Sequence, residues 1–65
     1  MTLLDLNRAG REELDRVPGL EGHGHDIVRY REERGGFTDL RQLEEVPGLT
    51  GKVTDAIRKQ LSIGG

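Results

Sequence analysis

The sequence contains no cysteine, and among its 65 residues only Tyr30 and Phe37 are aromatic. Without cysteine, neither disulfide bonds nor thiolate metal sites can reinforce the fold. A chain of this length forms one small domain, which buries only about 60% of its unfolded surface. Packing of aliphatic side chains must therefore hold this domain together.

Long apolar runs and an excess of positive charge are also missing. No run approaches the roughly 18 apolar residues of a membrane span, and no basic segment followed by an apolar run opens the chain as a leader would. Twelve acidic residues outnumber ten basic ones, so the net charge is −2. We expect a soluble segment without membrane contact, in which nucleic-acid binding would require a local basic patch.

What the sequence does contain is an internal repeat. Residues 14–29 and 43–58 align without a gap at an offset of 29, and eight of the sixteen positions are identical. The identical pairs are Leu14/Leu43, Val17/Val46, Pro18/Pro47, Gly19/Gly48, Leu20/Leu49, Gly22/Gly51, Asp26/Asp55 and Arg29/Arg58. In both copies the proline must end a helix, because it lacks an N–H group and pushes the preceding residue out of the α region.

A tight turn follows each proline. Gly19 and Gly48 can take the positive φ that a sharp reversal requires, and Gly22 and Gly51 supply a second permissive position. Each copy therefore predicts a helix, a glycine hairpin and a second helix.

The predicted fold is all-α, a tandem of two helix-hairpin-helix units. We expect four main helices, over about residues 8–16, 24–34, 39–45 and 52–61. Asn7 is predicted to cap the first helix and Thr38 the third. No segment alternates apolar and polar residues as a strand would, so no sheet is expected. The units, about 8–34 and 38–61, are related by a pseudo-two-fold axis within one domain over residues 1–65.

Apolar residues at helical spacing define the expected core, because neither unit could bury its apolar stripe alone. The predicted core residues are Leu14, Val17, Leu20, Ile27, Val28, Phe37, Leu43, Val46, Leu49, Ala56, Ile57 and Leu61. Phe37 is expected to fill the space between the two halves.

Four segments carry a family resemblance. Asn7 to Leu14 fits the pattern N-x-A-x-x-E-E-L, and Val17 to Leu20 follows as the first hairpin. Ile27 to Phe37 resembles I-I-x-Y-R-E-x-x-G-x-F, and Leu40 to Leu49 resembles the second hairpin, L-x-x-V-x-G-I. Together they resemble tandem helix-hairpin-helix domains, in particular the DNA-binding domain of the ComEA-type competence proteins of bacteria. The resemblance implies binding of double-stranded DNA without sequence preference, in DNA uptake during transformation.

The hairpins also suggest a mechanism. A glycine turn leading into a helix N-terminus presents N–H donors at the positive end of the helix dipole, which suits a phosphate. Two such turns would hold phosphates of both strands without reading bases, so binding should be salt-sensitive. The candidate DNA-binding residues are Gly19, Leu20, Gly22, His23, Gly24, Gly48, Leu49, Thr50, Gly51, Lys52, Arg58 and Lys59.

The two hairpins are not equivalent. Glu21 and Thr50 stand where the family commonly has a second glycine, and His23 stands where the second copy has Lys52. A carboxylate at Glu21 opposes an approaching phosphate by roughly a kcal/mol. An unperturbed His23 would be cationic only below about pH 6.5. We therefore expect the second hairpin to carry more of the DNA affinity.

A metal site is the alternative reading of the first hairpin. His23 and His25, with Glu21 and Asp26 beside them, have the side-chain chemistry of a divalent metal site. Two histidines without a third fixed imidazole or thiolate are more typical of a polar turn and helix cap. We expect no metal and no cofactor.

A protein-docking scaffold of the same fold is the alternative function, because acidic residues such as Glu44 and Glu45 would suit a basic partner. The sequence holds no Ser-His-Asp set implied by spacing and no P-loop, so neither an enzyme nor a small-molecule substrate is expected. Protein partners within a DNA-uptake machine fit the resemblance. Localisation is not encoded in the segment itself; a fragment of a competence receptor would be extracytoplasmic and membrane-associated.

Overall fold

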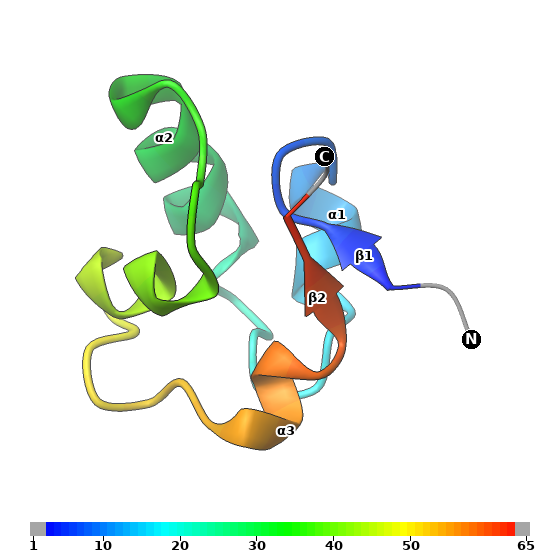
Figure 1. Ribbon diagram of the computed structural model, residues 1–65. Helices are drawn as coiled ribbons and strands as arrows, with labels where there is room; N and C mark the ends of the chain where they lie inside the picture. Colours follow the sequence, from blue (N-terminus) through cyan, green and yellow to red (C-terminus); the bar gives the residue numbers. More distant parts are fainter. Residues whose placement is uncertain (1–2, 64–65) are drawn as a thin grey trace.

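A computed structural model of the protein describes residues 3–63 (Figure 1). The predicted domain limits at residues 1 and 65 lie outside the described residues. The elements in chain order are β1 (Leu4–Asp5), α1 (Arg11–Asp15), α2 (Gly24–Arg34), the 3-10 helix η1 (Leu40–Glu45), α3 (Asp55–Arg58) and β2 (Leu61–Ser62). The described part of the chain thus contains four helices, and the all-α class is confirmed.

Helix α2 has both of its predicted ends, and the other three helices are shorter than predicted. Helix η1 ends at Glu45, directly before Val46-Pro47, and α1 ends at Asp15, one residue before Val17-Pro18, as the proline argument requires. Helix α3 covers only residues 55–58 of the predicted 52–61. Its start is set by Thr54, whose hydroxyl accepts a hydrogen bond from the Ile57 amide at 3.3 Å.

The prediction that the fold has no sheet is wrong in one detail. Strands β1 and β2 pair in parallel, with Leu4 opposite Leu61 and Asp5 opposite Ser62. The Leu4 amide donates to the Gln60 carbonyl at 3.1 Å, and the Leu6 amide donates to the Ser62 carbonyl at 2.9 Å. Strands of two residues are too short to show alternation in the sequence. This pairing joins the beginning and the end of the described chain (Figure 1).

Two predicted caps are also corrected. Helix α1 begins after Gly10, and Asn7 instead binds the backbone of Phe37, accepting from its N–H at 2.6 Å and donating to its carbonyl at 2.9 Å. Helix η1 is capped by Asp39 rather than by Thr38, because the Asp39 carboxylate accepts from the Arg41 amide at 2.9 Å. The Arg41 side chain also donates to this carboxylate, and these hydrogen bonds lower the pKa of Asp39.

Most of the predicted core is buried, in one cluster. The buried residues are Leu6, Ala9, Leu14, Val17, Leu20, Ile27, Tyr30, Phe37, Leu43, Val46, Leu49, Val53, Ile57 and Leu61. Two predicted core residues differ: Val28 is only partly buried, and Ala56 is exposed because the short α3 turns Ile57 toward the core instead. Phe37 stacks on Tyr30 with ring centroids 5.0 Å apart, so it fills the centre as expected.

Leu43→Ala should lower the free energy of unfolding by about 2–5 kcal/mol, because the Leu43 side chain is fully buried and truncation leaves a cavity. Leu3→Ala is the matched control, since Leu3 is 48% exposed and its loss should change stability much less. Thermal unfolding followed by circular dichroism measures both. An unchanged melting temperature for Leu43→Ala would contradict the packing described here.

Asn7→Ala should destabilise the fold by about 1–3 kcal/mol for each Phe37 backbone group left unpaired in the interior. Asn7→Asp keeps the acceptor for the Phe37 N–H but cannot donate to the Phe37 carbonyl when ionised, so it should lose part of that stability. Urea titrations of the three proteins compare the effects. Equal midpoints would show that the Asn7 contact contributes nothing to folding.

Candidate nucleic-acid interface

Both hairpins have the backbone conformation predicted from their glycines. Gly19, Gly22, Gly48 and Gly51 have φ values of 97°, 82°, 91° and 77°. A Cβ atom at Gly22 or Gly51 would meet nothing within 4 Å, so these two turns open toward solvent. Backbone that is both exposed and free of a side chain can be approached closely by a ligand.

Each hairpin packs against an element from the other half of the chain. A Cβ atom at Gly19 would lie 2.6 Å from the Ile57 side chain of α3, so only glycine fits there. A Cβ atom at Gly48 would lie 3.3 Å from the ring of His23, with Asp26 at 3.9 Å. The two hairpins therefore lie at the same end of the molecule, beside α3 (Figure 1).

The second hairpin leaves several backbone donors without a partner. Its turns are closed by the Leu49 amide donating to the Val46 carbonyl at 3.0 Å and the Lys52 amide donating to the Leu49 carbonyl at 2.9 Å. The amides of Gly48, Thr50 and Gly51 donate to no other described residue. Adjacent unpaired amides in a turn form a concave anion site.

Lys52 adds a positive charge to this hairpin. Its side chain is exposed and makes no ion pair with any residue between 3 and 63. Because α3 begins only at Asp55, Lys52 precedes the helix, and the prediction that it lies at the helix N-terminus is wrong. The Thr50 hydroxyl donates to the Glu44 carbonyl at 2.8 Å, so its proton is not available to a phosphate.

In the first hairpin, carboxylates of the chain itself accept from two backbone amides, those of Gly19 and Gly24. The Gly19 amide donates to Glu21 Oε1 at 2.8 Å, and the Gly24 amide donates to Asp15 Oδ1 at 2.8 Å. The repeat relates Gly19 to Gly48 and Gly24 to Val53, and neither of those later amides has a hydrogen-bond partner among the described residues. The first hairpin thus has the geometry to bind oxyanions, but Glu21 and Asp15 already accept from two of its amides.

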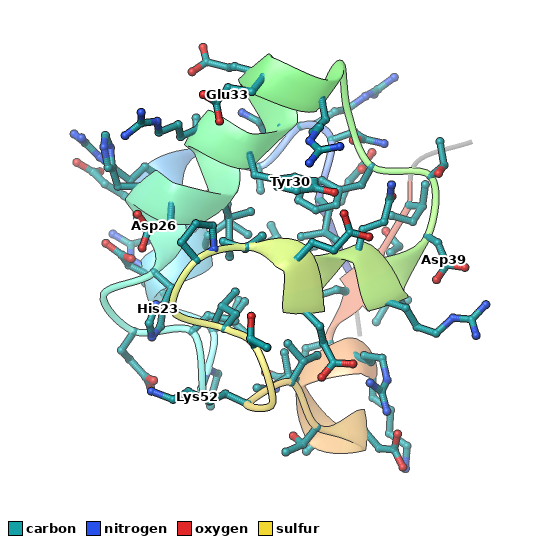
Figure 2. The ribbon with its side chains drawn as sticks, turned by 90° about the vertical axis from the view of Figure 1, so that its left-hand side faces the viewer. His23, Asp26, Tyr30, Glu33, Asp39 and Lys52 are labelled. Carbon is teal, nitrogen blue, oxygen red and sulfur yellow. The ribbon has the colours of Figure 1, made fainter. Side chains whose placement is uncertain are left out.

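His23 does not replace Lys52 as an outward cation. It precedes α2 without a side-chain capping bond, and its ring packs against Gly48 of the second hairpin (Figure 2). Its Nδ1 atom is buried and has no hydrogen-bond partner among the described residues. The residue therefore joins the two hairpins, a contact that the sequence did not indicate.

The remaining predicted site residues divide into structural and exposed ones. Leu20 and Leu49 are fully buried, so only their backbone can contribute to binding. A Cβ atom at Gly24 would lie 2.2 Å from the Arg11 carbonyl, so this glycine permits α1 and α2 to pack closely. Arg58 pairs with Asp55, whereas Lys59 is exposed and forms no ion pair within the described range.

An acidic groove of about 290 Å³ lies between α2 and the second hairpin, lined by Asp26, Arg29, Tyr30, Glu33 and Pro47. Figure 2 shows Asp26, Tyr30 and Glu33 following one another along α2. The Tyr30 hydroxyl donates to Glu45 Oε1 at 2.8 Å, and this hydrogen bond is the main reason why the pKa of Tyr30 is raised. Arg29 forms an ion pair with Glu33 at 3.8 Å. Asp26 and Glu33 together outnumber this one cation, so the groove is acidic.

A family profile described as the helix-hairpin-helix motif matches residues 2–62. The chain therefore belongs to the helix-hairpin-helix family, and this motif commonly binds DNA without sequence specificity. Comparison with curated proteins and with solved structures returned no match. Among the described residues, no helix combines the length and apolar character needed to cross a bilayer.

Zinc should leave the melting temperature of the protein unchanged. Over residues 3–63, no three or more His, Cys, Asp or Glu side chains are placed to hold a metal ion. A site at 100 times its dissociation constant would add about 2.7 kcal/mol to the free energy of unfolding. Thermal unfolding with and without zinc measures the difference, and a clear rise would show that the protein binds zinc after all.

Proposed function

We propose that this chain binds double-stranded DNA without sequence preference, and that the second hairpin is its principal phosphate site. The observation that carries the proposal is the set of amides at Gly48, Thr50 and Gly51 beside Lys52, all without a partner in the described part of the chain. Backbone amides and a lysine bind phosphate oxygens but have no means of distinguishing base pairs. Membership of the helix-hairpin-helix family supports the same assignment.

The two repeats act together in this proposal, as tandem helix-hairpin-helix units. The contacts of Gly19 with Ile57 and of Gly48 with His23 support it, because each turn rests on the other half of the chain. Two hairpins at one end of the molecule can face the two strands across a groove of the duplex. The stronger second hairpin would hold one strand, and the first would face the other.

The biological role we propose is that of a DNA-receptor domain in a protein for DNA uptake. This part rests on the resemblance of the chain to ComEA-type competence proteins, carried by the segments 7–14, 17–20, 27–37 and 40–49. Sequence-independent phosphate binding fits a receptor that must accept any incoming duplex.

Docking of a basic protein is the second candidate function, and the acidic groove beside Pro47 favours it. Its carboxylates at Asp26 and Glu33 would accept lysine or arginine side chains. A chain that served only as such a scaffold would bind no duplex, so the DNA titrations below separate the two functions.

Lys52→Ala should weaken binding to unrelated duplexes equally and flatten the plot of log K against log salt by about 0.9, the contribution of one phosphate contact. Arg11→Ala is the matched control, because Arg11 is an exposed cation on α1 without an ion pair in the described part of the chain. Fluorescence anisotropy at several salt concentrations gives both slopes. Unequal losses among sequences, or no duplex binding by the unmodified protein, would contradict the proposal.

Glu21→Gly and Glu21→Gln should both tighten DNA binding, most strongly at low salt, because each removes a negative charge from the first hairpin. Glu21→Gly should have the larger effect, since it also frees the Gly19 amide, whereas glutamine can still accept from it. Glu32→Gln, an exposed change on α2 away from the hairpins, controls for net charge. Tightening of the same size in Glu32→Gln would show that the effect is not local to the hairpin.

A further inference from the structure

A second groove, of about 270 Å³, lies where the start of the strand pair meets the end of α1. Its apolar lining comes from Leu3, Leu4, Val17 and Pro18. Two cations, Arg16 and Lys59, also line it. We call it the Arg16–Lys59 groove. Pro18 directly precedes Gly19, so the groove adjoins the first hairpin, and Lys59 directly follows α3.

Arg16 and Lys59 carry positive charges that no carboxylate of the described residues neutralises. Both side chains are exposed, and neither forms an ion pair or hydrogen bond with another described residue. Most other cations have a partner within the protein. Arg58, for example, pairs with Asp55, and Arg31 donates to the carbonyls of Leu6 and Ala9 at 2.9 and 2.7 Å.

One carboxylate, that of Glu13, also lines the Arg16–Lys59 groove. Its Oε1 atom accepts from the Gly10 amide at 2.9 Å, so it is held at the start of α1 by a backbone hydrogen bond. With two cations against this one anion, the groove is locally positive although the whole chain is acidic. A negatively charged ligand is therefore the complementary one.

The ligand must also match an apolar lining. A DNA strand offers phosphates for the two cations and the apolar faces of its sugars for Leu3, Val17 and Pro18. The aliphatic stems of arginine and lysine can lie along such a lining while their charged ends reach a phosphate. An acidic polypeptide has related chemistry, but the continuity of this groove with the first hairpin favours DNA.

We propose that Arg16 and Lys59 each bind a backbone phosphate of the strand that the first hairpin faces. The Gly19 amide cannot donate to a phosphate while it donates to Glu21, and the side chains of Arg16 and Lys59 provide phosphate contacts in its place. Arg16 thereby becomes a DNA-binding residue that the repeat does not predict, since the equivalent position in the second copy holds Glu45. The inference rests on the proposed DNA binding and extends it to a second surface.

The test measures duplex affinity against salt for Arg16→Ala, Lys59→Ala and the double variant, with Arg11→Ala as the control of equal charge. Each single variant should reduce the steepness of the log–log plot by about 0.9, and the double variant by about 1.8. Between about 50 and 200 mM salt, the affinity of each single variant should therefore fall about 3.5-fold less than that of the unmodified protein. Arg16→Lys keeps a cation and should keep the slope. Thermal unfolding verifies that each variant is folded.

The outcomes separate this inference from the function on which it rests. A less steep plot of log K against log salt for Arg16→Ala and Lys59→Ala, but not for Arg11→Ala, supports DNA binding at the Arg16–Lys59 groove. Duplex binding that depends on Lys52 while all three arginine and lysine variants behave alike would overturn the groove and leave the proposed function standing. No duplex binding by the unmodified protein would overturn both. Binding to a poly-glutamate peptide in place of the duplex, lost in Arg16→Ala, would assign the groove to an acidic polypeptide and overturn its assignment to DNA.

Discussion

The packing of each glycine turn against the other half of the chain is the constraint on which the rest of the structure depends. Gly19 approaches Ile57 so closely that a side chain would overlap it, and Gly48 rests on His23. Because the protein lacks disulfides and has only one core, these crossed contacts determine how its halves are placed. They also bring both hairpins to one end of the molecule, so that the two turns can contact one ligand at the same time, as the proposed DNA binding requires.

The repeat produces two turns of similar shape with different chemistry. Positive φ values recur at the four hairpin glycines, yet the amides of Gly19 and Gly24 donate to carboxylates of the chain. Those of Gly48 and Val53 have no partner within residues 3–63. A turn that binds its own Glu21 shows that the same backbone geometry accepts an oxyanion. The second hairpin has a turn of the same geometry with Lys52 beside it, which is the basis of the proposed phosphate site.

Sequence reasoning was accurate where a residue acts on its own backbone and less so where distant residues meet. Helix α2 matched its predicted ends, since Gly35 stops it with a φ of 77°. Asn7 was misassigned as a cap, because its contact with Phe37 spans thirty positions of the chain. The extent of α3 was overestimated because apolar spacing over 52–61 does not reveal that Thr54 begins the helix late.

The sequence by itself determined where the chain turns: prolines 18 and 47 end helices, and glycines 19, 22, 48 and 51 adopt conformations that other residues rarely take. These are steric properties of single residues, so no knowledge of the fold is needed to read them. Only the tertiary structure decided which donors and charges are free. The pairing of β1 with β2, the position of His23 on Gly48, and the groove that unites Arg16 with Lys59 all depend on segments far apart in the chain. Their meeting depends on how the whole core packs.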